Sequence, residues 1–450
     1  MACAGGLRSF LSKVRLDRNA RLAEVAAVGV SPRKPDFTVT FSPVTPIFMG
    51  GAEPNERAEM RLASIKGLLR FWYRAVDPEY KTHEARIFGG LSKDTGQSSF
   101  LLTLRQQWMD TSEWSAETVR ALKKENTFGR DTISGLGYVG FPLRVEPKGK
   151  SPVLRYSLPV SEPGGRNRTF VRVTHYWRPE RRSEQAAKAL VASWWLLCTL
   201  GGLGSRCRRG LGSVALDSWE GEEDLTTQLP LTSGAANLDD WEERVTKGLG
   251  VILRDWFPGS RDAKPTHSQL QDQPQLYVLK SGSAPWEWPK ALEEGGRLLQ
   301  AFRRKKPPDY GDVLAWLGSP AGTPLKQVPK RAAFGLPITW QYSSTSSRAE
   351  VQGGVLERDA NGRERMHPLD RMASPLWLRV IRVGKGHYPV FFQLRTPFLG
   401  GGVVVVQEKL KDGKTFLDGR QAHAPHPGGA ILAQFLDELA RNPDVRRVVL

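Results

Sequence analysis

Several features that define large classes of protein are missing from this sequence. It has three cysteines, Cys3, Cys198 and Cys207, and no Cys-x-x-Cys pair, which argues against a disulfide framework or a structural zinc site and for a reducing compartment. No stretch approaches the roughly 20 apolar residues of a membrane-spanning helix. The basic N-terminal segment lacks the apolar core of a secretory signal. We therefore expect a cytoplasmic protein without a membrane partner.

Signatures of common catalytic and cofactor sites are missing as well. No Gly-x-x-x-x-Gly-Lys-Ser/Thr loop is present, and no Rossmann, nucleophile-elbow or His-Glu-x-x-His pattern occurs in a suitable context. The seven histidines are scattered, and the pair His423 and His426 lies in a Pro/Gly loop without a nearby cysteine. The sequence therefore predicts no metal, no cofactor and no catalytic residue, and we expect a protein that is not an enzyme.

What the sequence has in excess is positive charge. Sixty-five Lys and Arg against 47 Asp and Glu leave a formal net charge of +18. Such an excess favours a polyanionic partner, because each neutralised phosphate releases condensed counterions. Charge alone also fits an anionic membrane or an arginine-rich proteome. The length of 450 residues and the 40% hydrophobic share predict two domains, or three, each with a real core.

The first elements that can be read are a strand and a helix. Alternating apolar residues predict a strand over Asp36–Phe41, and apolar residues at three- and four-residue spacing predict a helix over Asn55–Val76. Lys66, Arg70 and Arg74 form a basic stripe on that helix. Because like charges at this spacing destabilise a helix, we expect an acidic group outside it to face the stripe.

A second helix, largely apolar, is predicted over Glu184–Leu200 with Ser183 as its N-cap. The loop Gly201–Gly212 follows, and then a strand over Ser213–Leu216. Strand, helix, excursion, helix and strand give the outline of a ferredoxin-like β-α-β-β-α-β unit. We predict four regions: an N-terminal extension at 1–35, this first domain at 36–220, a mostly helical insertion or linker at 221–330, and the completion of a second α+β domain at 331–450.

The loop Gly201–Gly212 has five glycines and three arginines within twelve residues. The glycines allow close approach of the backbone to a ligand, and the arginines offer forked donors to phosphate. A nucleotide-hydrolysing cradle is excluded because here a helix ends at the loop, so the helix dipole offers nothing to an anion. The alternative is a helix C-cap with solvated arginines.

Two further segments are candidates for contact with single-stranded RNA. Phe48, Gly50 and Gly51 lie in a turn before the basic helix, where an exposed ring would stack on bases while the cations pair with phosphates. The alternative is that Phe48 is core and the stripe a solvated face. Arg166 and Arg168, followed by aromatic residues, form a third candidate, for which a basic strand edge is the alternative.

Taken together, these motifs resemble a known family. PVTPIFMGG, EMRLASIKGLLRFWYRA, EARIFGG and GGLGSRCRRGLGS resemble the RAMP proteins of CRISPR systems, and more narrowly the first subunit of the Cmr (type III-B) RNA-targeting effector complex. The motifs span Thr38–Ser213, and FGLPI at 334–338 and RMASPLWLRV at 371–380 extend the resemblance into the second half.

The resemblance implies an α+β fold with two ferredoxin-like (RRM-type) domains packed together, to which the helical insertion is added. It implies a non-catalytic RNA-binding subunit that acts in antiviral defence near the 3′ end of the guide RNA. The partners would be guide (CRISPR) RNA, target RNA and other Cmr-type subunits, including the backbone subunits. The candidate RNA contacts are then Phe48, Gly50, Gly51, Lys66, Arg70, Arg74, Arg166, Arg168, Gly201, Gly202, Gly204, Arg206, Arg208, Arg209, Arg371 and Ser374.

Two other functions stay open at this point. RAMP folds also include metal-independent endoribonucleases that process CRISPR repeat RNA, which would need a general base such as His83 or His175. A basic assembly module that meets only acidic protein partners is the third possibility.

Overall fold

The computed structural model describes residues 33–449, with gaps at 52–57, 92–95, 108–134, 141–142, 146–152, 155–156, 162–168, 262–264, 283, 305–307, 321, 342–346, 359–363, 370, 400–401 and 413–414. The chain forms two compact units, Met1–Asp36 and Phe37–Leu450. In the described end of the first unit, Arg33 pairs with Asp36 at 2.8 Å. Everything below concerns the second unit.

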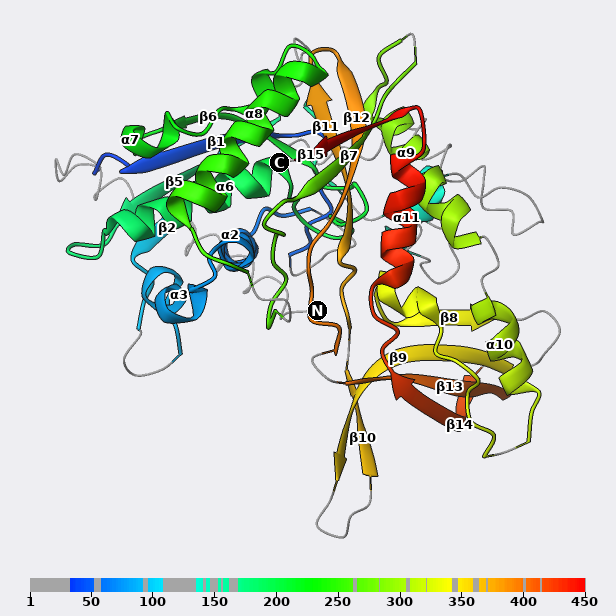
Figure 1. Cartoon of the computed structure of the whole chain (residues 1–450). Coiled ribbons are helices and arrows are strands. Elements are labelled where there is room, and N and C mark those ends of the chain that lie inside the picture. The colour runs from blue at the N-terminus through cyan, green and yellow to red at the C-terminus, as the bar shows by residue number, and fades with distance from the viewer. Residues whose placement is uncertain are drawn as a thin grey trace, which may run out of the picture. The chain divides into compact units, whose positions relative to one another are not determined.

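A four-stranded antiparallel sheet forms the first part of this unit, in the order β2-β5-β1-β6. Its strands are β1 (Phe37–Pro43), β2 (Phe100–Gln107), β5 (Phe170–Trp177) and β6 (Val214–Glu220). Helices α2 (Leu62–Val76) and α6 (Glu184–Thr199) pack against each other beside this sheet (Figure 1). The predicted first strand and second helix are therefore confirmed within one or two residues.

The start of α2 differs from the prediction. Residues 58–61 are not helical, because Ala58 forms a bridge with Gly50 and the Glu59 amide donates to the Met49 carbonyl at 2.8 Å. The helix therefore begins at Leu62, after the chain has paired with the preceding turn.

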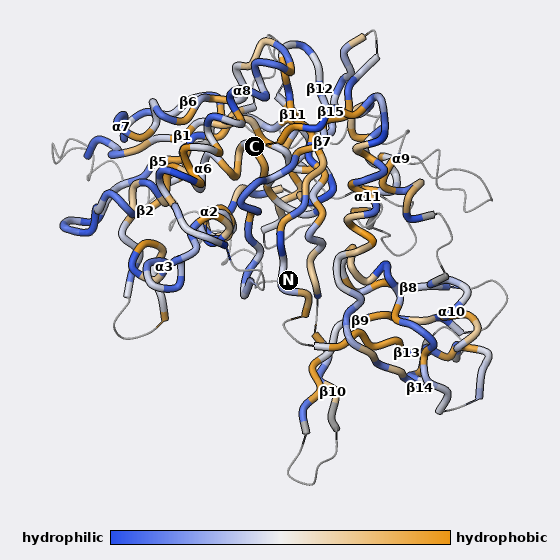
Figure 2. The backbone as a smooth tube through the Cα atoms, viewed as in Figure 1, coloured by the Kyte–Doolittle hydropathy of each residue, from blue (hydrophilic) through white to orange (hydrophobic). Residues whose placement is uncertain are grey.

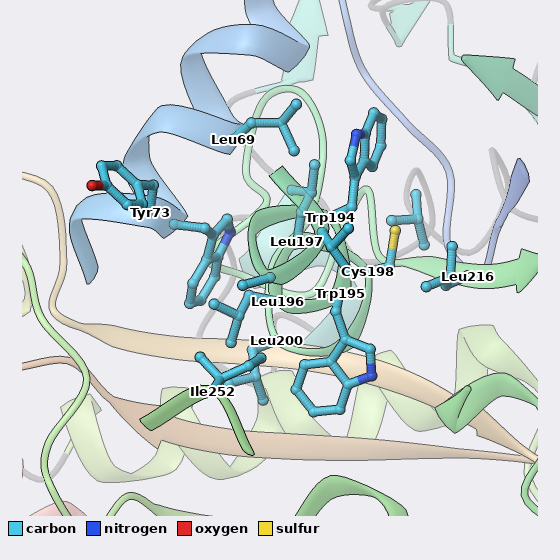
Figure 3. Close-up of a cluster of buried hydrophobic side chains, with 14 of the residues drawn as sticks. Leu69, Tyr73, Trp194, Trp195, Leu196, Leu197, Cys198, Leu200, Leu216 and Ile252 are labelled. Atoms are coloured by element: carbon cyan, nitrogen blue, oxygen red, sulfur yellow. The ribbon is translucent and has the colours of Figure 1, made fainter. Parts of the chain in front are cut away.

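Helix α6 supplies the centre of the main hydrophobic core. The Ser183 hydroxyl accepts a hydrogen bond from the Ala186 amide, which confirms the predicted N-cap. Trp194, Trp195 and Leu197 are fully buried, and hydrophobic residues run along this helix (Figure 2). Figure 3 shows the α6 side chains next to Leu69 and Tyr73 of α2. Burial on all faces is what the nearly continuous apolar sequence of α6 predicts.

A second antiparallel sheet has the order β11-β12-β7-β15. Its strands are β7 (Gln275–Leu279), β11 (Leu376–Val383), β12 (Gly386–Gln393) and β15 (Val445–Val449). Helices α9 (Trp288–Arg304) and α11 (Ala430–Ala440) pack on it. Numbered along the chain, the strands of both four-stranded sheets follow the same order, 2-3-1-4.

The region 221–330, predicted as mostly helical, contains α7 (Glu223–Thr226), α8 (Leu238–Gly250), the π-helical turn η3 (Val251–Trp256), α9 and α10 (Pro308–Leu317). It also contains β7, which lies between β12 and β15. This region therefore provides a central strand of the second sheet in addition to helices.

A third sheet, in the order β10-β9-β13-β14 with β8 paired to β9, follows α10 (Figure 1). Its strands are β8 (Ile338–Gln341), β9 (Ser347–Arg358), β10 (Glu364–Leu369), β13 (Val403–Asp412) and β14 (Thr415–Pro425). The predicted mixture of helices and sheets is confirmed, and the sheets are antiparallel. Among the helices of the described ranges, none combines the length and apolar character that crossing a bilayer requires.

His175 of β5 is fully buried in the first core. Its Nδ1 lies 3.1 Å from the Phe37 carbonyl oxygen, and its Nε2 accepts from the Trp194 indole at 2.8 Å, so the ring is the neutral Nδ1–H tautomer. Burial lowers the pKa of His175 to about 3. Since an unfolded histidine titrates near 6.5, the unfolded chain takes up a proton between pH 6.5 and 3 that the folded chain does not.

We therefore expect stability to fall as pH drops below 6.5, by up to about 1.4 kcal/mol per pH unit from this residue. In His175→Phe, the ring packing remains but the two hydrogen bonds are lost, so stability at pH 7 falls while its decline from pH 6 to 4 becomes shallower. Urea denaturation at several pH values measures both effects. The control is a substitution at exposed His367, His367→Gln; an unchanged pH slope in His175→Phe would contradict the assignment.

Candidate RNA-binding site

The loop Gly201–Gly212, here called the glycine–arginine loop, packs tightly on the turn Thr45–Gly51. The Ser205 amide donates to the Phe48 carbonyl at 2.7 Å and the Gly212 amide to the Pro46 carbonyl at 2.9 Å. Gly204 has φ 79°, and a Cβ there would lie 2.5 Å from the Phe48 carbonyl oxygen. Glycine is required at this position by both the left-handed backbone and the close approach. The glycine–arginine loop and the turn that contains Phe48, which the sequence offered as separate candidate sites, are therefore packed together.

The three arginines of this loop do not extend into solvent. Each donates to a backbone carbonyl from another part of the chain: Arg206 to Val139 at 2.8 Å, Arg208 to Ser374 at 2.6 Å, and Arg209 to Phe334 at 3.1 Å. Burial lowers the pKa of all three, that of Arg209 to about 9, so they remain charged at neutral pH. The alternative of solvated arginines is therefore wrong. Arg209 is also too deeply buried, at 8% exposure, for the predicted phosphate contact.

A fourth buried arginine reaches the same loop from the second sheet. Arg379 of β11, 3% exposed, donates to the carbonyls of Cys198, Gly201 and Val214. Burial lowers the pKa of Arg379 to about 10. The Leu378 amide adds a bond to the Arg208 carbonyl at 3.1 Å. The glycine–arginine loop and β11 therefore form a joint between the first and second sheets. The predicted contacts Gly201 and Gly202 are buried in this joint.

Phe48 is not available for base stacking. Its side chain is 2% exposed and belongs to the core cluster that contains Leu136, Leu211 and Leu292. The prediction of an exposed Phe48 ring is therefore wrong, because the apolar side chain gains more from burial against the second sheet's core than from solvent exposure. Gly50 and Gly51 beside it are half-buried.

The basic stripe of α2 has an internal acidic partner. Glu84 of α3 (Tyr80–Phe88) accepts two bonds from Arg74, at 2.5 and 2.6 Å, and pairs with Arg70 at 3.0 Å. Arg70 also donates to the Phe88 carbonyl at 2.9 Å. The expectation of an acidic group facing the stripe is confirmed. Arg74 is consequently neutralised by the protein itself, which leaves Lys66 as the cation of the stripe without a carboxylate in the described ranges.

Lys66 lies in a groove of about 590 Å³, here called the α2 groove, between α2 and the start of β2. Arg70 and Arg178 line it too, and none of the described lining residues is acidic. Lys66 donates to the Ser98 hydroxyl at 2.7 Å, and Arg178 to the Ser98 carbonyl at 3.0 Å. Burial, followed by Arg70 and Arg178, lowers the pKa of Lys66. Three cations thus share one open depression.

Exposed apolar side chains border the same groove. Leu91 is fully exposed and Leu101 is 47% exposed, and both line the groove. Cations beside exposed apolar surface suit a ligand with both phosphate and flat, weakly polar parts. Sequence reasoning missed Arg178, although the run Arg178-Pro-Glu-Arg-Arg before α6 gave a basic signal.

A smaller pocket of about 260 Å³, here called the joint pocket, lies at the glycine–arginine loop. Arg208 and Arg371, two predicted residues 163 positions apart in the chain (371 minus 208), both line it. Ser374, also predicted, lies behind it: its side chain is 7% exposed and its carbonyl accepts from Arg208. The loop segments Thr266–Ser268 and Thr396–Leu399 also contribute to the lining, and no local motif in the sequence marks either one.

Two predictions concern other parts of the chain. Arg166 and Arg168 lie outside the described residues. Within the described ranges, no three His, Cys, Asp or Glu side chains are grouped in a way that would hold a metal ion.

Comparisons with known proteins agree with the resemblance predicted from the sequence. Residues 40–215 match the model of the RAMP superfamily, which confirms that resemblance. The chain is 24% identical over 344 residues to the CRISPR system Cmr subunit Cmr1-1 of Pyrococcus furiosus, covering 74% of this chain and 79% of that protein.

Two solved structures are similar. The apo crystal structure of Cmr1 from Pyrococcus furiosus has a TM-score of 0.51 at 18% identity, covering 92% of this chain and 98% of that one, so the two share a fold. A chain of the type III-B Cmr-β complex bound to cognate target RNA and AMPPnP has a TM-score of 0.44 at 12% identity, covering 81% and 95%.

The joint yields a stability prediction. Arg379→Met keeps the bulk of the side chain but leaves three buried carbonyls without their donor, so we expect a loss on the order of 3 kcal/mol in the free energy of unfolding. Denaturant titration against Lys385→Met, a change in the exposed β11–β12 turn, measures it. A loss equal to that of the control would show that Arg379 does not hold the joint.

The close approach of the glycine–arginine loop to the Phe48 carbonyl yields a second stability prediction. Gly204→Ala places a methyl group against the Phe48 carbonyl at positive φ and should lower the melting temperature. Gly67→Ala, within α2, meets nothing within 4 Å and should raise stability by about 0.5–1 kcal/mol. Thermal melts of the two variants should therefore move in opposite directions; a neutral Gly204→Ala would contradict the described packing.

Proposed function

We propose that this chain is a non-catalytic RNA-binding subunit of a type III-B CRISPR effector complex, and that single-stranded RNA lies in its α2 groove. The observation that carries the proposal is the convergence of Lys66 and Arg178 on a groove without a described carboxylate, bordered by exposed Leu91 and Leu101. Phosphates would pair with the cations, and bases would pack on the leucines.

The similarity to Cmr1-1 supports the place of this chain in such a complex. We propose the partners that this similarity suggests: guide and target RNA, contacted toward the 3′ end of the guide, and the other Cmr-type subunits, backbone subunits included. The net charge of +18 supports a polyanionic partner independently of the similarity.

We further propose that both four-stranded sheets belong to ferredoxin-like, RRM-type units. The supporting observation is the element order β1-α2-β2-β5-α6-β6 in one and β7-α9-β11-β12-α11-β15 in the other, with the same strand order in both. On this interpretation the second ferredoxin-like domain begins at β7, near residue 275, and the third sheet consists of two insertions into that domain. The second domain, which the sequence placed at 331–450 after an insertion at 221–330, would then start near residue 275.

The endoribonuclease alternative loses one of its two candidate bases. His175 is fully buried with both ring nitrogens bonded inside the protein, so it does not meet a substrate. His83 is more accessible and lines a pocket of about 470 Å³ with Arg86, Arg181 and Arg182. Incubation of the protein with CRISPR repeat RNA without metal tests this alternative. We expect no cleavage, and discrete products lost in His83→Ala would overturn the non-catalytic assignment.

The proposed role of the α2 groove can be tested by RNA binding. Lys66→Ala combined with Arg178→Ala should weaken binding of a single-stranded RNA oligonucleotide severalfold, and should reduce the slope of log K against log salt by about 0.7 for each phosphate that the protein no longer neutralises. Fluorescence anisotropy at several salt concentrations measures both quantities. Lys247→Ala on the exposed face of α8 removes the same type of charge elsewhere and serves as the control. Equal affinity and slope in all three proteins would exclude the α2 groove as the RNA site.

A further inference from the structure

The joint pocket is separate from the α2 groove and is built by loops from distant parts of the chain. Its walls come from Arg208 of the glycine–arginine loop, the segment Thr266–Ser268 before β7, Leu369 and the residues 371–373 before β11, and the segment Thr396–Leu399 after β12. A ligand here would therefore contact the joint and the loops that lead into the second and third sheets at the same time.

Arg208 is held in this pocket in a fixed orientation. Its guanidinium carbon lies 4.8 Å from the ring centroid of Trp377 and 5.4 Å from that of Phe71, and Nη1 donates to the Ser374 carbonyl. No bond to a described residue uses Nε or Nη2. A guanidinium that is half-buried, stacked on aromatic rings and left with spare donors is preorganised for an anion.

The other polar groups that line the joint pocket also favour a ligand with a negative charge. Arg371 is exposed and contributes a second guanidinium, and the described lining contains no carboxylate. Burial, followed by the charge of Arg74, lowers the pKa of the His267 imidazole to about 4, so this ring is neutral at pH 7. The hydroxyl groups of Ser268 and Thr396 bond to each other at 3.1 Å on the same wall.

The remaining wall is apolar and includes a strained residue. Leu369, Met372, Pro397 and Leu399 line it, and Leu399 has a φ of 53°, in the left-handed region that a leucine rarely adopts. Backbone strain of this kind costs about 1–3 kcal/mol and gathers at ligand sites. A methionine beside such a wall adapts readily to a flat ring.

We propose that the joint pocket binds one unstacked nucleotide of a single-stranded RNA, with its phosphate on Arg208 and Arg371 and its base against Met372 and Leu399. The inference rests on the proposed RNA-binding function and adds a second contact on the same strand. A volume of about 260 Å³ suits one nucleotide and excludes a duplex or a protein segment. A free nucleoside triphosphate would bring several phosphates to a site with two cations, so we assign the nucleotide to a strand.

Arg371→Ala is the direct test, because the side chain is exposed and its removal leaves the joint intact. We expect at least fivefold weaker binding of a single-stranded RNA oligonucleotide, with unchanged thermal stability. Lys385→Ala, an equal loss of charge in the exposed turn between β11 and β12, should retain the affinity of the unaltered protein. Equal effects of the two substitutions would show general charge attraction and would overturn the pocket.

Photocrosslinking shows where the RNA lies on the protein. RNA carrying 4-thiouridine should crosslink to peptides that contain Met372 or Leu399, and these crosslinks should disappear in Arg371→Ala. Crosslinks confined to the α2 groove would refute the joint pocket and leave the proposed function standing, whereas absence of any RNA binding would refute both. AMP as competitor distinguishes the source: displacement of the crosslink at concentrations similar to those of the oligonucleotide would assign the pocket to a free nucleotide instead.

Discussion

The structure depends on buried guanidinium groups that are solvated by backbone carbonyls. Arg379, Arg208 and Arg209 lie between the first two sheets, and in the described chain their bonds go to main-chain oxygens and not to carboxylates. A buried charge is costly unless strong acceptors replace its water. Helix α6 ends at Cys198 and Thr199, where the negative end of its dipole favours a cation. The helix end that is unsuited to a ligand anion thus suits the protein's own Arg379.

Local sequence signals predicted local structure well. Ser183 caps α6, the apolar run after it is buried, and the strand predicted at 36–41 lies where alternation placed it. The strand β7 was not recognised, because its short apolar run, Leu276–Leu279, does not distinguish a strand from part of a helix. The start of α2 was placed too early because pairing with the preceding turn is a tertiary effect.

The candidate site was predicted less well, for a related reason. Composition shows what an arginine or a phenylalanine can do, but not whether a distant segment already occupies it. The partners of Arg208 and Arg209 lie 166 and 125 residues away, and those of Arg70 and Arg74 belong to a different helix. Only the three-dimensional arrangement separates the cations used for internal packing from Lys66, Arg178 and Arg371, which face open depressions.

The length of chain between the two sides of the joint has a consequence for synthesis on the ribosome. The carbonyl groups of Cys198 and Gly201 emerge 181 and 178 residues before the arginine that binds them. The first sheet can form as soon as β6 is available, since domains generally fold from the N-terminus during translation. For the time needed to make more than a third of the protein, this nascent intermediate holds the Arg208 guanidinium and the Cys198 and Gly201 carbonyls without their final partners. It is the stage at which chaperone capture or misassembly would compete most strongly with folding.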